Sequence, residues 1–151
     1  MSMEITKAAD YGLRAMYRLG QTPKDTSALI GDIATEMQIP AQFLHKVMPR
    51  LVKAGLVRSR RGARGGYRLA KDPCEISLLQ IVQAIDGPIF LNRCLFDHDD
   101  CSRNEDCTIR PVFAKAQDAL RRVLDNSKLA DVLNGKRPLE PHDLSGPPSA
   151  I

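Results

Sequence analysis

Apolar residues recur with the spacing of an α-helix in three stretches of the first 55 residues. The first stretch covers residues 6–19, where apolar side chains at three- and four-residue intervals keep one face hydrophobic. Two shorter stretches follow at residues 30–37 and 41–55, and Pro40 separates them. A helix, a short turn and a second helix form a helix-turn-helix motif, which the sequence therefore predicts here.

The helix-turn-helix interpretation depends on small and aliphatic residues at the positions where two crossing helices touch. Ala34, Leu44 and Val47 occupy those positions. The turn requires a residue with a positive φ angle, which is usually glycine because glycine lacks a Cβ atom. This sequence has Gln38 there, which departs from the usual pattern.

Apolar and basic residues alternate on both sides of a glycine-rich centre after the third helix. The two arms are residues 56–60 and 67–69, and the segment that joins them reads RGARGG. Alternation with a period of two predicts strands, and the glycines can supply the turn between them. A hairpin that directly follows a helix-turn-helix is typical of a wing. Neither a GK[ST] ending nor a following helix supports a phosphate-binding loop.

The second half of the chain predicts two further helices with an irregular segment between them. Ser77 is placed to cap a helix over residues 77–85. We expect almost no regular element from about residue 91 to 108, and then a long helix from Pro111 to about Asn126. A wide apolar stripe on the long helix consists of Val112, Phe113, Ala116, Leu120, Val123 and Leu124. The stripe can pair with a second copy of the chain or pack within one copy, and periodicity alone does not separate these alternatives.

These elements predict a mainly α protein with a small β-wing, a winged helix-turn-helix followed by a long C-terminal dimerisation helix. We expect a DNA-binding region at residues 1–73. A linker helix, a cysteine loop and the dimerisation helix fill residues 74–133, with a final turn at 129–133, and a flexible tail covers 134–151.

Positive charge is concentrated in one part of the chain, although the net charge is only +4. Nine lysines and arginines lie between Leu44 and Lys71, with no Asp or Glu among them. Cations that replace counterions along phosphates bind DNA, so we expect double-stranded DNA as the partner. The candidate DNA contacts are Gln42, His45, Lys46 and Arg50 on the third helix, and Arg58, Arg60, Arg61, Arg64, Gly65, Gly66 and Tyr67 in the hairpin.

Composition and apolar run lengths bear on where the protein acts. A hydrophobic content of 43% suits a globular core. No apolar run approaches the roughly 20 residues that cross a bilayer, and the N-terminus lacks the apolar stretch of a secretory signal. We therefore expect a cytoplasmic protein that does not enter a membrane.

Three cysteines lie close together in an acidic segment. Cys94, Cys101 and Cys107 are separated by six and then five residues, and three cysteines in a polar loop indicate thiolate chemistry. Structural zinc sites normally contain C-x-x-C pairs, which are absent, although His98 can complete a Cys-three-His zinc site. An iron–sulfur cluster accepts longer spacings because its ligands surround a larger object, and bare redox thiols are the third alternative. Cys74 lies outside the segment and is interpreted as an ordinary thiol.

The arrangement of cysteines, histidines and carboxylates argues against an enzyme. A thiol oxidoreductase would be expected to carry C-x-x-C, and the basic half has no Cys–His or paired-carboxylate constellation. We therefore predict that the protein is not an enzyme.

Taken together, these motifs resemble the Rrf2 family of winged-helix iron–sulfur transcription regulators, which has IscR-like and NsrR-like members. The likeness covers about residues 3–133. It rests on the opening helix ITKAADYGLR at residues 5–14, on the stretch from Gly55 through Gly65-Gly66-Tyr67, and on the three-cysteine loop before the long helix. The combination is specific, whereas each motif alone is weak.

The resemblance implies a homodimer crossed through the long helices, with a cluster bound by the three loop cysteines. In nitric-oxide-sensing members, an Asp near the start of the partner's first helix ligates a four-iron four-sulfur cluster, and Asp10 falls at that position. In IscR-like members, a His just after the third cysteine ligates a two-iron two-sulfur cluster, but Thr108 follows Cys107 here. The missing His favours the NsrR-like, four-iron arrangement over the two-iron one.

The resemblance also assigns roles in DNA binding and function. His45 takes the place of a Glu that is important for promoter choice in IscR-like members, and Arg61 takes the place of a minor-groove Arg. The implied function is a cluster-dependent repressor that senses nitric oxide, redox state or iron–sulfur status. The alternative is a zinc-stabilised or thiol-based winged-helix regulator without an iron–sulfur cluster.

Overall fold

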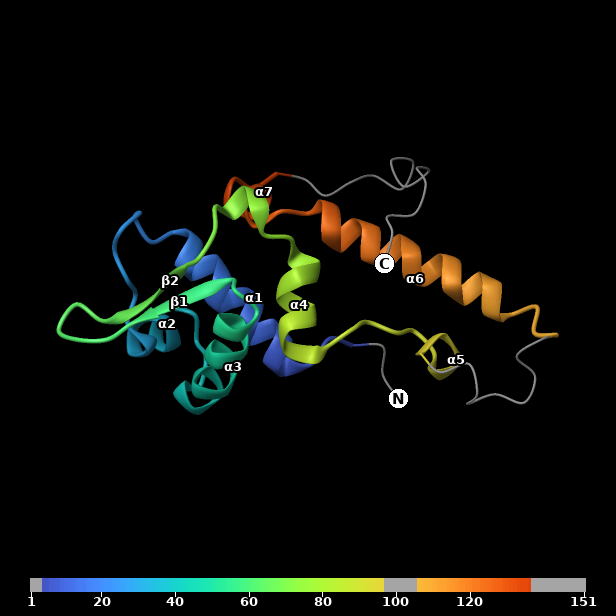
Figure 1. Cartoon of the computed structure of the whole chain (residues 1–151), viewed down its shortest axis with the longest axis horizontal. Coiled ribbons are helices and arrows are strands. Elements are labelled where there is room, and N and C mark those ends of the chain that lie inside the picture. The colour runs from blue at the N-terminus through green and yellow to red at the C-terminus, as the bar shows by residue number, and fades with distance from the viewer. Residues whose placement is uncertain (1–3, 97–105, 137–151) are drawn as a thin grey trace.

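The structure, a computed structural model, describes residues 4–96 and 106–136 of the 151-residue chain. Its elements in chain order are α1 (Lys7–Gly20), α2 (Ile30–Glu36), α3 (Ala41–Lys53), β1 (Val57–Arg60), β2 (Gly66–Leu69), the 3-10 helix η1 (Pro73–Glu75), α4 (Leu78–Asp86), α5 (Arg93–Phe96), α6 (Arg110–Asn126) and α7 (Leu129–Leu133). The first four helices and the hairpin gather in one body, and α6 projects from it (Figure 1). The expected class, mainly α with a small β-wing, is confirmed.

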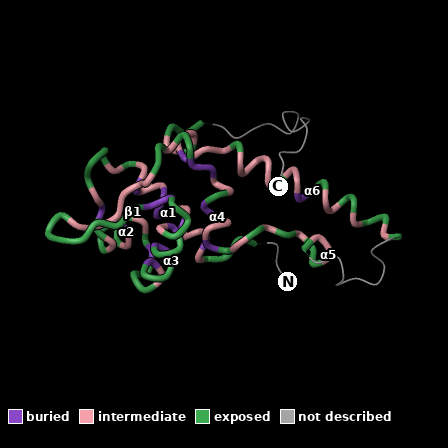
Figure 2. The backbone as a smooth tube through the Cα atoms, in the orientation of Figure 1, coloured by how far each residue is buried: buried purple, intermediate pink, exposed green. Residues whose placement is uncertain are grey.

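The hydrophobic core lies where α1, α3 and α4 meet. Met16, Leu44, Met48 and Ile81 are fully buried there, and Leu129 of α7 joins the same core. Burying an aliphatic side chain of this size contributes about 1.5–3 kcal/mol, so the body is the stable part of the chain. Buried positions are concentrated in this body, whereas α6 is mostly half-buried or exposed (Figure 2).

The turn between α2 and α3 has the backbone conformation that the helix-turn-helix interpretation requires. Gln38 has a φ of +54°, a left-handed conformation that costs a non-glycine residue about 1–2 kcal/mol. Two backbone hydrogen bonds close the end of α2: Ile39 N–H donates to Ala34 O at 2.9 Å, and Gln38 N–H donates to Thr35 O at 3.4 Å. This Schellman pattern satisfies the last carbonyls of α2 and turns the chain into α3.

The helix boundaries of the second half follow the sequence closely, with one exception. The Ser77 hydroxyl accepts the Gln80 N–H at 3.2 Å, and the Gln80 side chain accepts the Ser77 N–H at 3.0 Å, so the expected cap of α4 is a full capping box. The expectation of no regular element after residue 91 was wrong over Arg93–Phe96, which forms α5. An edge-to-face contact of the Phe90 and Phe96 rings, with centroids 4.9 Å apart, supports this short helix.

The long helix α6 is attached to the body at its C-terminal end. Leu129 N–H donates to Ile76 O at 2.8 Å, and Leu78 N–H donates to Ser127 O at 3.0 Å. Farther along, the Gln117 side chain is buried and accepts the Leu91 N–H at 3.1 Å. The expected final turn is confirmed as α7, and residues 137–151 of the expected tail lie outside the described residues. No helix in the described part of the chain is long and apolar enough to span a membrane.

Candidate nucleic-acid interface and cysteine segment

Helix α3 has one buried and one exposed face. Its buried side chains are Leu44, Val47, Met48 and Leu51. Because helical positions repeat every 3.6 residues, the side chains of Gln42, His45 and Lys46 lie on the other face, and all three residues are exposed. Amide, imidazole and ammonium groups on an exposed helix are suited to base edges and phosphates in a major groove.

The hairpin carries its arginines at the exposed end. Arg60, Arg61 and Arg64 are all exposed, and Gly65 N–H donates to Gly62 O at 2.8 Å to close the turn. The hairpin is also fastened to the body close to its turn, through Tyr67, which pairs with Ser59 in the ladder. The Tyr67 N–H donates to Ala28 O and the Tyr67 carbonyl accepts the Ala28 N–H, both at 2.8 Å. Three guanidinium groups are thus presented on a hairpin that is anchored to the body just behind its turn.

Gly66 permits the close contact between β2 and the segment before α2. Its φ is +132°, and a Cβ atom there would lie 2.5 Å from the carbonyl oxygen of Ala28. Gly65 is similarly restricted, because its Cβ would lie 2.7 Å from the carbonyl oxygens of Arg60 and Gly62. Both glycines were candidate DNA contacts from the sequence, and the structure gives each of them a role in backbone packing.

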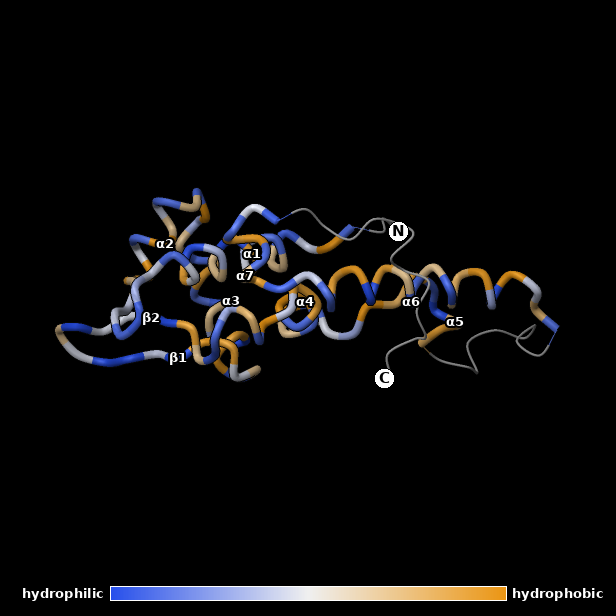
Figure 3. Tube along the Cα trace, turned by 90° about the horizontal axis from the view of Figure 1, so that it is seen from above, coloured by the Kyte–Doolittle hydropathy of each residue, from blue (hydrophilic) through white to orange (hydrophobic). Residues whose placement is uncertain are grey.

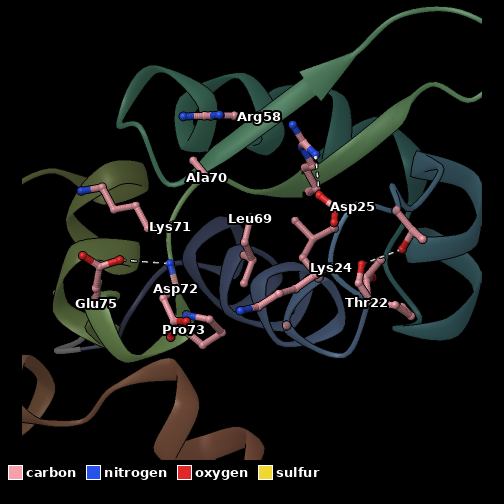
Figure 4. A pocket seen from close by; sticks show the side chains of 15 residues that line it. Thr22, Lys24, Asp25, Arg58, Leu69, Ala70, Lys71, Asp72, Pro73 and Glu75 are labelled. Carbon is pink, nitrogen blue, oxygen red and sulfur yellow. Dashed lines mark hydrogen bonds and ion pairs between the residues drawn. The ribbon is translucent and has the colours of Figure 1, made fainter.

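Two other candidate DNA contacts, Arg50 and Arg58, lie near the C-terminal end of α3 and in β1 away from the turn of the hairpin, respectively. Arg50 donates from Nη1 to the backbone carbonyl of Ile85 at 2.8 Å and so reaches α4. Arg58 lies directly opposite Arg68 across the β1–β2 ladder. Arg58 and Arg68 line a hollow of about 580 Å³, and its other walls are the α1–α2 loop and η1 (Figure 4). The remaining charged residues in its lining are Lys24, Lys71, Asp25, Asp72 and Glu75.

Cys74 lies in η1, next to the carboxylate of Asp72. The Asp72 carboxylate caps η1 by accepting the Cys74 N–H at 2.9 Å, which lowers the pKa of Asp72. A hydrogen bond from the Cys74 thiol to that carboxylate raises the pKa of the thiol above its usual value, and the negative charge of Asp72 adds to the effect. Cys74 is exposed, and its raised pKa means a smaller thiolate fraction at a given pH than an unperturbed cysteine has.

The two described loop cysteines lie near the N-terminal end of α6. Cys94 belongs to α5, Cys107 precedes α6 by three residues, and both are half-buried free thiols. Arg110, the first residue of α6, donates from Nε to the Cys94 carbonyl at 3.3 Å and holds α5 against this end of the helix. The other candidate ligands of the loop, Cys101 and His98, lie outside the described residues.

The surroundings of these thiols suit an anionic metal group. The N-terminal end of α6 carries the positive end of the helix dipole, and Arg110 adds a positive charge at the same place. Thiolates are the donors that iron–sulfur clusters and zinc share. Within residues 4–96 and 106–136, no three metal-ligating side chains gather at one point.

Asp10, the expected fourth ligand, lies in the first turn of α1. Its carboxylate forms an ion pair with Arg14 at 2.7 Å, and about two fifths of its side chain is exposed. Helix α1 lies in the body, whereas α5 lies beside the projecting α6 (Figure 1).

The apolar stripe of α6 is largely uncovered in the single chain. Val112 is 64% exposed and Leu120 is 37% exposed, which is uncommon for residues of a regular apolar stripe. Hydrophobic residues recur along the length of α6 (Figure 3). A groove of about 830 Å³ runs between α6 and the segment that precedes it, and its apolar lining includes Ile89, Phe90, Phe96, Leu120 and Leu124.

A helix-turn-helix with an exposed polar face, followed by an arginine-bearing wing, defines a winged-helix DNA-binding protein. Comparison with known proteins gives the same class. The chain belongs to the Rrf2 family, because residues 5–135 match the family model described as an iron-dependent transcriptional regulator. Members of this family are transcriptional regulators and not enzymes, as the sequence predicted.

Individual relatives match over most of their length. The HTH-type transcriptional regulator NsrR of Halalkalibacterium halodurans is 34% identical, and the match covers 91% of this chain and 95% of NsrR. The structure of CymR, the global cysteine regulator of B. subtilis, is similar with a TM-score of 0.73 and 28% identity over 89% of this chain and 98% of CymR. The IscR structure from T. potens has a TM-score of 0.71 and 28% identity over 87% of each chain.

Proposed function

We propose that the protein is a homodimeric repressor, acting in the cytoplasm, whose DNA binding depends on an iron–sulfur cluster held by Cys94, Cys101 and Cys107. The observation that carries the proposal is the position of two half-buried thiols at the positive end of α6. The family's description as iron-dependent and the likeness to NsrR and IscR support it.

The remaining ligand in this proposal is Asp10 of a second copy of the chain. An oxygen donor in place of the His of IscR-like members favours a four-iron four-sulfur cluster over a two-iron two-sulfur one. When bound, such a cluster supplies a centre that reacts with nitric oxide or oxidants. Arg110 lies beside the Cys94 carbonyl and offsets part of the negative charge of the ligands.

The proposed dimer forms through α6. A second copy of the same helix is the occupant that best fits an apolar stripe on α6 and an apolar groove beside it. Dimerisation would cover Val112 and Leu120 and bring Asp10 of one copy toward the cysteine segment of the other. Two recognition helices in one dimer would then read two half-sites about one helical turn apart.

The proposed DNA contacts divide between the two grooves. On α3, Gln42, His45 and Lys46 would enter the major groove. In the wing, Arg60, Arg61 and Arg64 would bind the minor groove or the backbone. We further propose that His45 gives the protein a sequence preference different from that of IscR-like members.

The first test is the composition of protein purified without oxygen. A brown protein with iron and acid-labile sulfide supports the proposal, and the iron content separates the four-iron from the two-iron form. Cys94→Ser should abolish the colour, whereas Cys74→Ser, which changes a thiol outside the segment, should keep it. A colourless protein with about one zinc per chain would favour the zinc-stabilised alternative. A metal-free protein that does not take up iron and sulfide would favour the thiol-based one.

Asp10 needs its own test with a matched control. Asp10→Ala removes the carboxylate together with the ion pair to Arg14, and Arg14→Ala removes the same ion pair but leaves the carboxylate. We expect Asp10→Ala to lose the cluster or change its spectrum, and Arg14→Ala to retain it, because an exposed ion pair contributes little. An unchanged spectrum and response in Asp10→Ala would exclude Asp10 as a ligand.

A further inference from the structure

The C-terminal end of α4 is a junction of three helices. Arg50, near the end of α3, donates to the carbonyl of Ile85 at 2.8 Å. That carbonyl is one of the last four of α4, which have no partner within their own helix. A guanidinium group there also interacts favourably with the negative end of the helix dipole. The Arg50 side chain therefore bridges the recognition helix to the end of α4.

Helix α1 holds the same end of α4 from another side. The Asp86 carboxylate accepts the Thr6 N–H at 3.1 Å and also accepts the Thr6 hydroxyl. The Ile85 side chain is 5% exposed and packs against Gly12, where a Cβ atom would lie 2.0 Å from Ile85 Cδ1. A displacement of the C-terminal end of α4 would therefore also shift α1 and α3.

The cysteine segment begins directly after this junction. Gly87, with a φ of +80°, ends α4, and Cys94 follows nine residues after Ile85. On α1, Asp10 lies one turn beyond Thr6, whose carbonyl accepts the Asp10 N–H at 3.0 Å. The start of α1 and the segment after α4 carry the proposed cluster ligands. Both are therefore connected to the contacts around Ile85 and Asp86.

We propose that Arg50 is a positioning residue that couples the cysteine segment to the orientation of the recognition helix, and that it does not act as a DNA contact. The proposal rests on the proposed function, because it supplies the route by which the state of the cysteine segment alters DNA binding. Coupling of this kind requires an element that both sites influence, and the end of α4 is that element. Without the Arg50 contact, α3 remains packed through its apolar face but loses its hydrogen bond to the last turn of α4, so it follows movements of that turn less closely.

The first experiment compares Arg50→Gln and Arg50→Lys with Lys53→Gln. Lys53 is an exposed residue in the same last turn of α3, so its variant removes the same charge without removing a contact to α4. The affinity of each variant is measured with and without a reconstituted cluster, over a range of salt concentrations. The probe is a DNA duplex that the wild-type protein selects from a random-sequence library.

For Arg50→Gln we expect the ratio of the DNA affinity with the cluster to the DNA affinity without it to fall by about fivefold or more. The dependence of affinity on salt concentration should not change. Arg50→Lys, which keeps a donor, should restore part of the ratio, and Lys53→Gln should leave the ratio at the wild-type value. If Arg50 instead contacts a phosphate, both forms of Arg50→Gln weaken by the same factor and the salt slope falls by about one. That result would overturn the proposal.

A second measurement does not depend on the cluster. Asp86→Ala is made in the wild-type and Arg50→Gln backgrounds, and backbone hydrogen exchange in the last turn of α3 is compared in metal-free protein. We expect Asp86→Ala to accelerate this exchange in the wild-type background and to add nothing when Arg50 is absent. Equal acceleration in both backgrounds, or none in either, would refute the coupling even if a cluster binds. Loss of coupling can thereby be separated from failure of the proposed function.

Discussion

Replacement of Gly66 by alanine tests how the wing is held to the body. The backbone conformation at Gly66, with φ of +132°, costs an alanine about 1–3 kcal/mol. The new Cβ would also lie 2.5 Å from the carbonyl oxygen of Ala28, a backbone atom that cannot rotate away. Strand β2 must therefore move from Ala28 and lose the two hydrogen bonds that Tyr67 makes there. Each of these hydrogen bonds contributes about 0.5–1.5 kcal/mol. Together with the backbone cost, the free energy of unfolding should therefore fall by about 2–6 kcal/mol.

Gly62→Ala is the matched control for this prediction. Gly62 also has a positive φ, +103°, but no atom lies within 4 Å of the position of its Cβ. The free energy of unfolding of Gly62→Ala should fall only by the conformational cost of about 1–3 kcal/mol. Both variants can be measured by urea unfolding followed by circular dichroism. If Gly62→Ala and Gly66→Ala lose the same stability, the contact with Ala28 does not hold the wing, and the reasoning fails.

Three further outcomes follow from the site. Lys46→Ala should weaken DNA binding and reduce the salt slope by about one unit, and an unaltered slope would place the DNA contact elsewhere. Asp72→Ala should speed the alkylation of Cys74 by iodoacetamide at pH 8, because the carboxylate raises the pKa of the thiol and removing it increases the thiolate fraction. An equal or slower rate would contradict this electrostatic account. Replacing Val112 and Leu120 by Asp should convert a dimer into monomers in analytical ultracentrifugation, and a dimer that persists would exclude the α6 stripe as its interface.

Much of the body could be predicted because its signals are local. The turn with Gln38 was expected at the point where a positive φ is found, since the motif fixes that conformation by its length. The cap at Ser77 was likewise visible, because the capping box with Gln80 spans only three residues. Both hairpin strands lie within a residue of the alternation that predicted them.

The features that could not be predicted depend on contacts between distant residues. Arg50 was placed among the DNA contacts because it is a basic residue on α3, but its partner is a backbone carbonyl 35 residues away, which no side-chain pattern reveals. Gly66 was read as part of a turn, whereas the close approach of Ala28 is what restricts it. Helix α5 was missed because four residues are too short for a periodic signal.

Helix α6 joins the body at its C-terminal end. Its hydrogen bonds farther along, between Gln117 and Leu91 and between Arg110 and Cys94, are to the segment that carries α5, so α6 and that segment can turn together as a lever. The helix has 17 residues and is therefore about 25 Å long, with its fixed point where Ser127 and Leu129 hydrogen-bond to the chain around α4. A rotation of about 10° at that point would carry the far end through about 4 Å. Cys107 lies just beyond the far end. A small rotation of α6 near α7 therefore produces a larger displacement at the end where Cys107 lies. A force applied at that far end exerts its greatest torque on the body.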